Sequence, residues 1–253
     1  MNLVSTGARR LVESVVSAEH RVLILGAGGW FGRTALDLLN GTGAEIMAVA
    51  STARTLDVDG TPVDTVRWDE RTVHDFAPSV IIDCAFLTHD RVKTMPLEEY
   101  VAVNRALIAN LIEATGAPST QKVVTISSGA GVYPSDAAKG PLSDNPYGYL
   151  KRETESLLAA ATAGSGVTAV AARAWSVSGA YARHPRSYAL GDMIAQAMGG
   201  SIEIAARTQV WRRYCSADEL LAVALAVDAP GFTTIDSGGP LVEMADLAEA
   251  VRA

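Results

Sequence analysis

A short apolar strand that runs directly into glycines constrains the fold of this chain more than any other feature. Residues 21–32 read RVLILGAGGWFG, in which Gly26, Gly29 and Gly32 follow four apolar residues at intervals of three. The next segment has helical spacing, so the pattern predicts a buried strand, a glycine turn and a helix. Backbone N–H groups at such a turn can approach a phosphate where a side chain would collide with it. The stretch therefore predicts a nucleotide-binding site, although an ordinary tight turn gives the same pattern.

Strands alternate with helices over the rest of the first 175 residues. Further strands are predicted at 44–51, 63–68, 79–86, 122–128 and 167–175, and helices at 7–18, 97–115 and 146–161. Because strand–helix–strand crossovers are right-handed, this order predicts an α/β fold with a Rossmann-type, doubly wound parallel sheet.

The order becomes irregular after the sixth strand. Helices are predicted near 188–198, at 217–227 and from Val242 onward, and strands at 201–206 and 232–239. We therefore expect a dinucleotide-binding Rossmann body at 1–175, to which 210–240 returns. A small C-terminal substrate-binding lobe is expected at 176–209 and 241–253.

Composition argues against several classes of partner. The formal net charge is -7, and no cluster of lysine and arginine occurs, which disfavours nucleic acid and anionic membranes. No apolar run is long enough to span a bilayer, and polar residues interrupt the N-terminal segment, so we expect a cytoplasmic location. Cys84, Cys215 and four scattered histidines lack metal-ligand spacing, so no metal site is expected. A small-molecule role fits this composition best.

Tyr147 and Lys151 carry the predicted chemistry. They lie four residues apart in NPYGYLK, so a helix would project both from one face. A neighbouring ammonium favours the phenolate and lowers the pKa of a phenol, so the pair can exchange a proton near neutral pH. A surface tyrosine over a solvated lysine has the same spacing. The glycine turn and a strand that ends in Ser127, Ser128 and Gly129 favour the catalytic interpretation.

Together these motifs resemble those of the extended short-chain dehydrogenases/reductases, the NAD-dependent epimerase/dehydratase family, over nearly the whole chain. GAGGWFG is similar to the family's GxxGxxG, and NPYGYLK to its YxxxK. The resemblance implies that Tyr147 is the acid/base and that Lys151 holds the nicotinamide ribose while lowering the tyrosine pKa. It also implies a nucleotide-sugar substrate and a homodimer formed through the helices at 97–115 and 146–161.

Four further segments are similar to the family's pattern. WDER resembles a segment whose aspartate, here Asp69, contacts adenine, and DCAF resembles the fourth-strand end beside the cofactor. In VAVNRALIANLIEA the matching asparagine is Asn104. WRRYCSADEL is similar to a segment whose arginine, matched by Arg212, grips a substrate diphosphate. Trp175 and Ser176 stand where relatives often show Phe-Asn, so Ser176 is expected to line the substrate pocket.

The end of the second strand bears on the choice of cofactor. NAD enzymes place an acidic residue there for the ribose hydroxyls, whereas a small polar residue with a nearby arginine accommodates a 2'-phosphate. Here Ser51 and Arg54 occupy the segment and no acid occurs before Asp57, which favours NADP. NAD stays an alternative, because Arg54 has no such role if it lies on the open surface. The predicted cofactor-binding residues are Gly26, Gly29, Trp30, Phe31, Gly32, Ser51, Arg54, Asp69, Cys84, Ala85, Phe86, Asn104 and Lys151.

One departure from the family pattern bears on activity. The hydroxyl that polarises the substrate carbonyl lies three residues before the valine of the family's VYG, and Gly129 stands there in SSGAGVYP. With Ser128 in that role, the chain is predicted to be an NAD(P)-dependent epimerase or 4-keto reductase. Dehydration is the least favoured outcome, because no acidic pair accompanies the hydroxyl. The alternative is a regulatory or accessory protein that binds NAD(P) without turnover.

Overall fold

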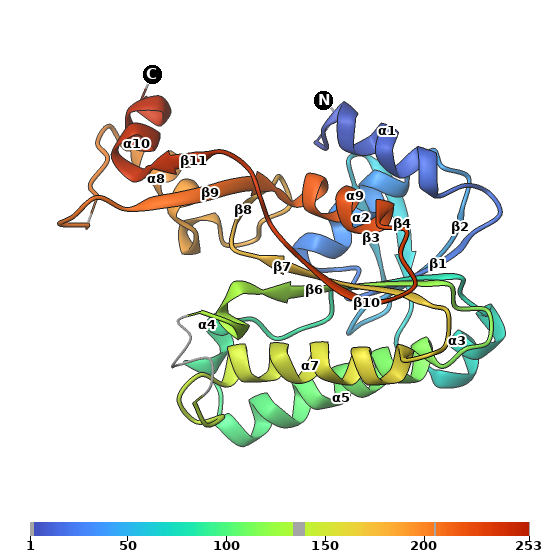
Figure 1. Cartoon of the computed structure of the whole chain (residues 1–253). Coiled ribbons are helices and arrows are strands. Elements are labelled where there is room, and N and C mark those ends of the chain that lie inside the picture. The colour runs from blue at the N-terminus through green and yellow to red at the C-terminus, as the bar shows by residue number, and fades with distance from the viewer. Residues whose placement is uncertain (1–2, 134–139, 205, 253) are drawn as a thin grey trace.

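A six-stranded parallel sheet forms the centre of the computed structural model, which describes residues 3–133, 140–204 and 206–252 (Figure 1). In spatial order its strands are β10 (Gly231–Asp236), β7 (Thr168–Ala174), β6 (Lys122–Ser128), β5 (Val80–Asp83), β1 (Arg21–Leu25) and β2 (Glu45–Val49). Every neighbouring pair is parallel. The predicted Rossmann-type fold is confirmed. The chain order reverses between β1 and β5, and ligands of such sheets bind beyond the carboxyl ends of the strands at this point.

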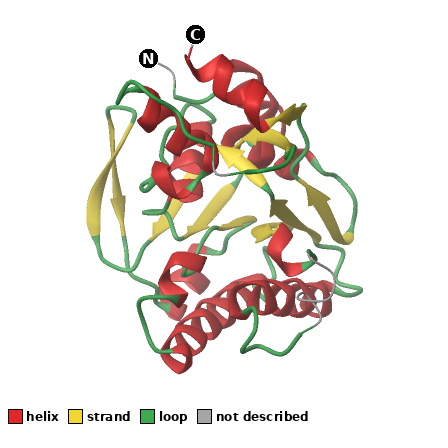
Figure 2. Ribbon diagram, turned by 90° about the vertical axis from the view of Figure 1, so that its left-hand side faces the viewer, coloured by secondary structure: helices red, strands yellow, loops and turns green. Residues whose placement is uncertain are grey.

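Helices cover both faces of this sheet. Figures 1 and 2 show the long helices α5 (Leu97–Thr115) and α7 (Pro146–Thr162) side by side on one face. The body also contains α3 (Glu70–Phe76), which contacts α5, and the helices α1 (Thr6–Val15), α2 (Trp30–Leu39) and α9 (Ala217–Ala226), which pack on one another.

The apolar residues of β1 explain why the strand is buried on both sides. Val22 and Ile24 belong to the apolar cluster beneath α2 and α9, whereas Leu23 and Leu25 belong to the cluster beneath α5 and α7. Successive side chains of a strand point to opposite faces, so a wholly apolar run is needed between two helical layers.

The predicted strand at 63–68 is wrong as a member of the sheet. Residues of this region form a separate antiparallel hairpin of β3 (Arg54–Val58) and β4 (Thr61–Thr65). Asp59 and Gly60 have positive φ angles of 47° and 80°, as a two-residue hairpin turn requires. A single parallel bridge from Val66 to Val49 is what connects the end of this hairpin to β2.

A smaller unit follows β7 and lies at the upper left of Figure 1. It contains the three-stranded sheet of β8 (Ser176–Ser178), β9 (Trp211–Ser216) and β11 (Leu241–Glu243), the short helix η2 (Pro185–Ser187), and the helices α8 (Ala189–Ala197) and α10 (Met244–Arg252). Met193, Ile202, Met244 and Ala248 form its own apolar cluster.

The strand predicted at 201–206 does not form at Ser201–Ile204, and residue 205 lies outside the described residues. Two side chains from neighbouring helices take up backbone groups there. The Gln196 side-chain oxygen accepts from the Glu203 N–H at 2.7 Å, and Arg252 donates to the Ile202 carbonyl at 2.8 Å.

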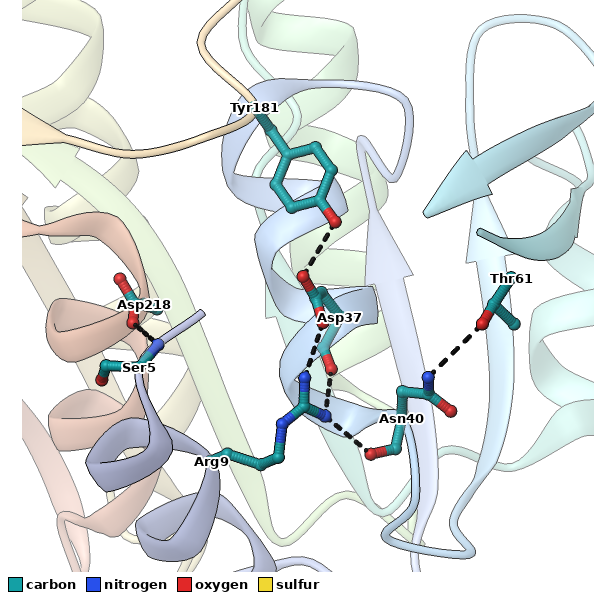
Figure 3. A network of polar contacts seen from close by, with 7 residues as sticks. All are labelled: Ser5, Arg9, Asp37, Asn40, Thr61, Tyr181 and Asp218. Carbon is teal, nitrogen blue, oxygen red and sulfur yellow. Dashed lines mark hydrogen bonds and ion pairs between the residues drawn. The ribbon is translucent and has the colours of Figure 1, made fainter. Parts of the chain in front are cut away.

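Helix α1 is joined to the body by a buried polar network (Figure 3). Asp37 of α2, 1% exposed, accepts from Arg9 at 2.7 Å and from the Tyr181 hydroxyl at 2.8 Å. The Ser5 N–H donates to Asp218 of α9 at 2.7 Å. The network thus ties α1 to the chain that follows β8. None of the helices in the described ranges is long and apolar enough to cross a membrane.

Candidate active site

The glycine turn after β1 has no space for side chains at two of its positions. Gly26 has a φ of +76°, and a Cβ on it would lie 2.7 Å from the backbone of Ala85. A Cβ on Gly32 would lie 2.6 Å from the Ala27 Cα. Because both neighbours are backbone atoms, the turn can approach β5 and α2 this closely only with glycine at both positions. The first of these contacts brings the turn against the segment that carries Cys84, Ala85 and Phe86.

The N-terminus of α2 is open to an anion. Its N-cap residue Gly29 supplies no side-chain cap, so the N–H groups of the first turn, which begins with Trp30 and Phe31, are available to a ligand. Arg54, at the start of β3, reaches over this turn: its Nη2 lies 3.1 Å from where a Cβ of Gly28 would be. Ser51 follows β2 and is exposed. A glycine cradle, a free helix N-terminus and a nearby guanidinium fit the diphosphate and ribose of a dinucleotide.

Tyr147 lies in the first turn of α7, which packs directly on the loop after β6. Asn145 caps this helix by accepting from the Gly148 N–H at 2.9 Å, and its amide donates to the Ala130 carbonyl at 3.0 Å. A Cβ on Gly148 would lie 2.8 Å from the Ala130 carbonyl carbon. This close approach places Tyr147 beside Ser128 at the end of β6, near enough for the serine hydroxyl to lower the pKa of the phenol.

Lys151 lies one helical turn after Tyr147 and is 5% exposed. Its ammonium donates to the Ile126 carbonyl at 2.6 Å and lies 3.7 Å from the centroid of the Phe86 ring. Burial lowers the pKa of Lys151 to about 8, against the opposing effect of the buried Asp83 carboxylate. The Lys151 ammonium therefore gives up its proton more readily than an exposed lysine does.

The expected lowering of the Tyr147 pKa is not found. Burial raises the pKa of Tyr147, and the hydrogen bond with Ser128 lowers it by less. The physical reason is that the Lys151 ammonium is directed to the Ile126 carbonyl and the Phe86 ring, while the phenol has lost much of its contact with water.

Asn104 acts on the loop after β5. It is fully buried, its side-chain oxygen accepts from the Leu87 N–H at 2.8 Å, and its amide donates to the Tyr100 carbonyl at 3.1 Å. The Tyr100 hydroxyl donates to the Leu87 carbonyl at 2.8 Å. The backbone N–H and carbonyl of Leu87 are thus both hydrogen-bonded, which fixes the segment that carries Phe86. The position of Asn104 is that of a residue that orients this loop.

Asp69 lies at the N-cap of α3, where its carboxylate accepts from the N–H and the hydroxyl of Thr72 at 2.8 and 2.6 Å. The hydrogen bonds with Thr72 lower the pKa of Asp69. Its contact with adenine stays a prediction.

The sequence model of the NAD dependent epimerase/dehydratase family matches residues 22–230. The chain belongs to this family. The predicted recognition is confirmed, and with it a nicotinamide-dependent enzyme of the epimerase/dehydratase type. No curated protein sequence matches the chain.

Several solved structures have the same fold. MoeE5 in complex with UDP-glucose and NAD is 23% identical, with a TM-score of 0.71 over 91% of this chain and 80% of that one. The UDP-glucose 4-epimerase from Brucella ovis in complex with NAD is 22% identical, with a TM-score of 0.71 over 91% and 81%. Epimerase Mth375 from Methanothermobacter thermautotrophicus is 18% identical, with a TM-score of 0.74 over 97% and 79%.

Gly129 departs from the family pattern in the structure as well as in the sequence. It opens the short helix η1 (Gly129–Gly131), and the Trp175 indole lies against it. Ser128, one residue earlier, carries the hydroxyl that lowers the pKa of Tyr147. The structure thus brings together Ser128, Tyr147 and Lys151.

Sequence reasoning missed His89 as a neighbour of the tyrosine. His89 begins the short helix α4 (His89–Val92), and its ring lies edge-on to Tyr147 with centroids 6.3 Å apart. The Phe86 ring lies 5.6 Å from Tyr147 in the same manner. The signal was the position of His89 three residues after DCAF, which was overlooked because the four histidines were judged as possible metal ligands.

The predicted substrate residues lie in the three-stranded sheet. Ser176 of β8 pairs with Tyr214 of β9, and the exposed Arg212 lies two residues before Tyr214. Among the described residues no hydrogen bond connects Arg212 with Tyr147. The small unit instead approaches the glycine turn through Tyr188, whose ring packs edge-on against Trp30 with centroids 5.0 Å apart.

Proposed function

We propose that this enzyme is an NADP-preferring epimerase or 4-keto reductase that acts on a nucleotide sugar. The observation that carries the proposal is the placement of Tyr147 at the start of α7, against the loop that follows Ser128 and one helical turn from the buried Lys151. The same edge of the sheet holds the glycine turn, which suits a dinucleotide diphosphate.

A bound dinucleotide would supply the carbon that accepts or returns a hydride. As the phenolate, Tyr147 would accept the proton of a substrate hydroxyl during oxidation, and as the phenol it would return that proton during reduction. The Ser128 hydroxyl donates to the carbonyl oxygen that forms. Lys151 binds ribose hydroxyls and, as a cation, favours the phenolate once it faces a ligand.

The proposed preference for NADP rests on Arg54. Its guanidinium lies beside the glycine turn, and the residue at the end of β2 is Ser51 rather than an acid. An ion pair with a 2'-phosphate would therefore favour NADPH over NADH. Titration of the wild type is expected to give tighter binding of NADPH. Arg54→Met should abolish this difference, and Arg54→Lys should keep part of it; equal binding of both cofactors by the wild type would contradict the preference.

The proposed substrate class takes support from the fold relatives and from the smaller unit. The MoeE5 structure is a complex with UDP-glucose and NAD, and the structure of the UDP-glucose 4-epimerase from Brucella ovis is a complex with NAD. We assign residues 176–209 and 241–253 to a substrate lobe, in which Ser176 lines the pocket and Arg212 binds the diphosphate. Arg212→Met should then raise the KM for UDP-glucose about tenfold or more while NADPH affinity is unchanged.

We also propose a homodimer through α5 and α7. Leu97, Val103 and Leu157 of these helices are exposed apolar side chains, and Arg105 pairs with Glu153 between the two helices at 3.0 Å. Gel filtration with light scattering should give twice the chain mass. A monomer at micromolar concentration contradicts this part of the proposal.

Turnover is tested by Tyr147→Phe. Keto-sugar nucleotides and UDP-glucose are offered with NADPH or NADP, and hydride transfer is followed at 340 nm or with labelled cofactor. General acid–base catalysis contributes about 10²–10⁴-fold, so Tyr147→Phe should lose that factor in kcat with dinucleotide binding retained. The matched control is Tyr149→Phe, two residues along the same helix. Turnover that is unchanged in Tyr147→Phe would contradict the role of Tyr147 as acid/base. No turnover in a wild type that binds dinucleotide tightly would favour the regulatory alternative that Gly129 suggests.

A further inference from the structure

The loop after β6 has no room for a side chain at position 129, where Gly129 stands. A Cβ built on Gly129 would lie 2.5 Å from Cε3 and 2.6 Å from Cε2 of Trp175. Real Cβ atoms do not approach ring atoms this closely, so even alanine at this position would require the indole to move. The absent hydroxyl and the tryptophan are therefore one structural feature: the indole lies where a serine side chain would project.

Two hydrogen bonds hold Trp175 in this place. Its indole N–H donates to the Asp236 carboxylate at 2.7 Å, and its backbone N–H donates to the Ser237 hydroxyl at 2.9 Å. Asp236 ends β10, and Ser237 is buried and donates its own N–H to the Arg173 carbonyl at 2.9 Å. The indole is thus anchored on both sides to the end of the strand that neighbours β7. Its N–H is occupied by Asp236 and cannot replace the missing hydroxyl.

The anchored ring presents an apolar surface to solvent. Trp175 is 45% exposed, and the Tyr133 ring, 66% exposed, lies 6.0 Å from it at an angle of 56°. Large aromatic rings left open and held rigidly are typical of binding surfaces, because they offer contact area with little loss of side-chain entropy. Trp175 touches Gly129, the neighbour of Ser128, so this surface borders the end of β6 where Ser128 lies.

We propose that Trp175 is a specificity-determining residue whose indole packs against the C–H face of the substrate's sugar ring, and that Gly129 is the small residue that makes room for it. The inference rests on the proposed function and adds how the site selects its substrate. One face of a hexose is largely C–H and lies flat on an indole, whereas its hydroxyl edge is left for Ser128 and Tyr147. The exchange of a hydroxyl for an indole thus gives up one hydrogen bond and gains a wall that orients the sugar.

The first test measures binding rather than turnover, so it gives a result even if the enzyme is inactive. UDP-glucose and UDP are titrated into the wild type, Trp175→Ala and Trp175→Phe by calorimetry in the presence of NADPH. We expect Trp175→Ala to weaken UDP-glucose at least tenfold and UDP less than twofold, with Trp175→Phe between the two. Equal weakening of UDP and UDP-glucose, no weakening of either, or a wild type that binds NADPH but no UDP-glucose would each overturn the assignment.

The second test addresses the coupling of the two positions. Gly129→Ser is made in the wild type and in Trp175→Ala, and each variant is unfolded in urea and titrated with UDP-glucose. In the wild type the new side chain should lower the urea midpoint and weaken UDP-glucose at least tenfold, since it displaces the indole. In the Trp175→Ala background, Gly129→Ser should leave the urea midpoint unchanged within experimental error and the affinity for UDP-glucose unchanged within twofold. Equal effects in both backgrounds would show that the indole does not occupy the place of the hydroxyl.

Discussion

The attachment of α1 to the body depends on the carboxylate of Asp37 (Figure 3). Asp37 is almost completely buried, and its partners are the Arg9 guanidinium, 2.7 Å away, and the Tyr181 hydroxyl, 2.8 Å away. Arg9 also donates to the Asp37 and Asn40 carbonyls, each at 2.9 Å. Arg9→Met keeps the aliphatic stem and removes the cation, so a buried carboxylate would be left with a single neutral donor.

The expected loss follows from the burial of both partners. Breaking a buried ion pair by removal of one partner costs about 3–5 kcal/mol, because the other charge is left uncompensated. The Arg9 side chain is 21% exposed and that of Asp37 only 1%, so water solvates part of the arginine but not the carboxylate. We therefore take the lower end of this energy range. We expect Arg9→Met to lower the free energy of unfolding by about 3 kcal/mol. For a chain of this size that corresponds to a fall in Tm of about 6–12 °C.

Urea denaturation followed by circular dichroism measures the change. Arg10→Met is the matched control, because Arg10 is the next residue of the same helix and is exposed; it should change the free energy by less than about 0.5 kcal/mol. Arg9→Met combined with Asp37→Asn should lose less than the sum of the two single changes, since neither variant group is then charged. A loss below about 0.5 kcal/mol in Arg9→Met, or additive single changes, would refute the reasoning.

Three other perturbations have defined outcomes. The pKa of Lys151 is lowered to about 8 in the folded chain, so between pH 8 and about 10.5 the unfolded state binds more protons and folded stability should rise with pH. The difference in free energy of unfolding between the wild type and Lys151→Met should therefore grow by about 3 kcal/mol over this pH range. A difference that does not change with pH would contradict the prediction. Gly32→Ala places a Cβ 2.6 Å from the Ala27 Cα, so it should cost about 1–3 kcal/mol in urea and weaken NADPH binding. Arg173→Met leaves the buried Glu155 carboxylate without its bidentate partner, with donors at 2.9 and 2.6 Å; a loss of about 3 kcal/mol is expected, and one below about 1 kcal/mol would argue against this contact.

The central sheet could be predicted because its determinants are local. The apolar run of β1, the glycines behind it and the helical spacing of α2 lie within one short stretch, and burial between two helical layers imposes that pattern. The pairing of Tyr147 with Lys151 was likewise visible, because four residues make one turn of α7.

Other parts of the structure depend on contacts between distant segments. Residues 63–68 have the pattern of a strand, but whether this strand extends the sheet or forms a hairpin depends on the strand with which it pairs. The segment 201–206 has the pattern of a strand, but the Glu203 N–H and the Ile202 carbonyl bond to the side chains of Gln196 and Arg252 instead of to another strand. The position of Trp175 over Gly129 has no local signal, because β6 and β7 become neighbours only when the sheet forms.

The two ends of the site follow different physical rules, and this explains why sequence reasoning served them unequally. The phosphate end is made of backbone, so the identity of Gly26 and Gly32 alone shows what can approach it. The chemical end is made of side chains whose charge depends on burial, which raises the pKa of Tyr147 and lowers that of Lys151. The spacing of the two residues showed that they share a helical face, but the direction of the tyrosine shift depends on where Ile126 and Phe86 hold the ammonium. A ligand hydroxyl that draws the ammonium away from these partners would bring the pair toward the phenolate that proton removal requires.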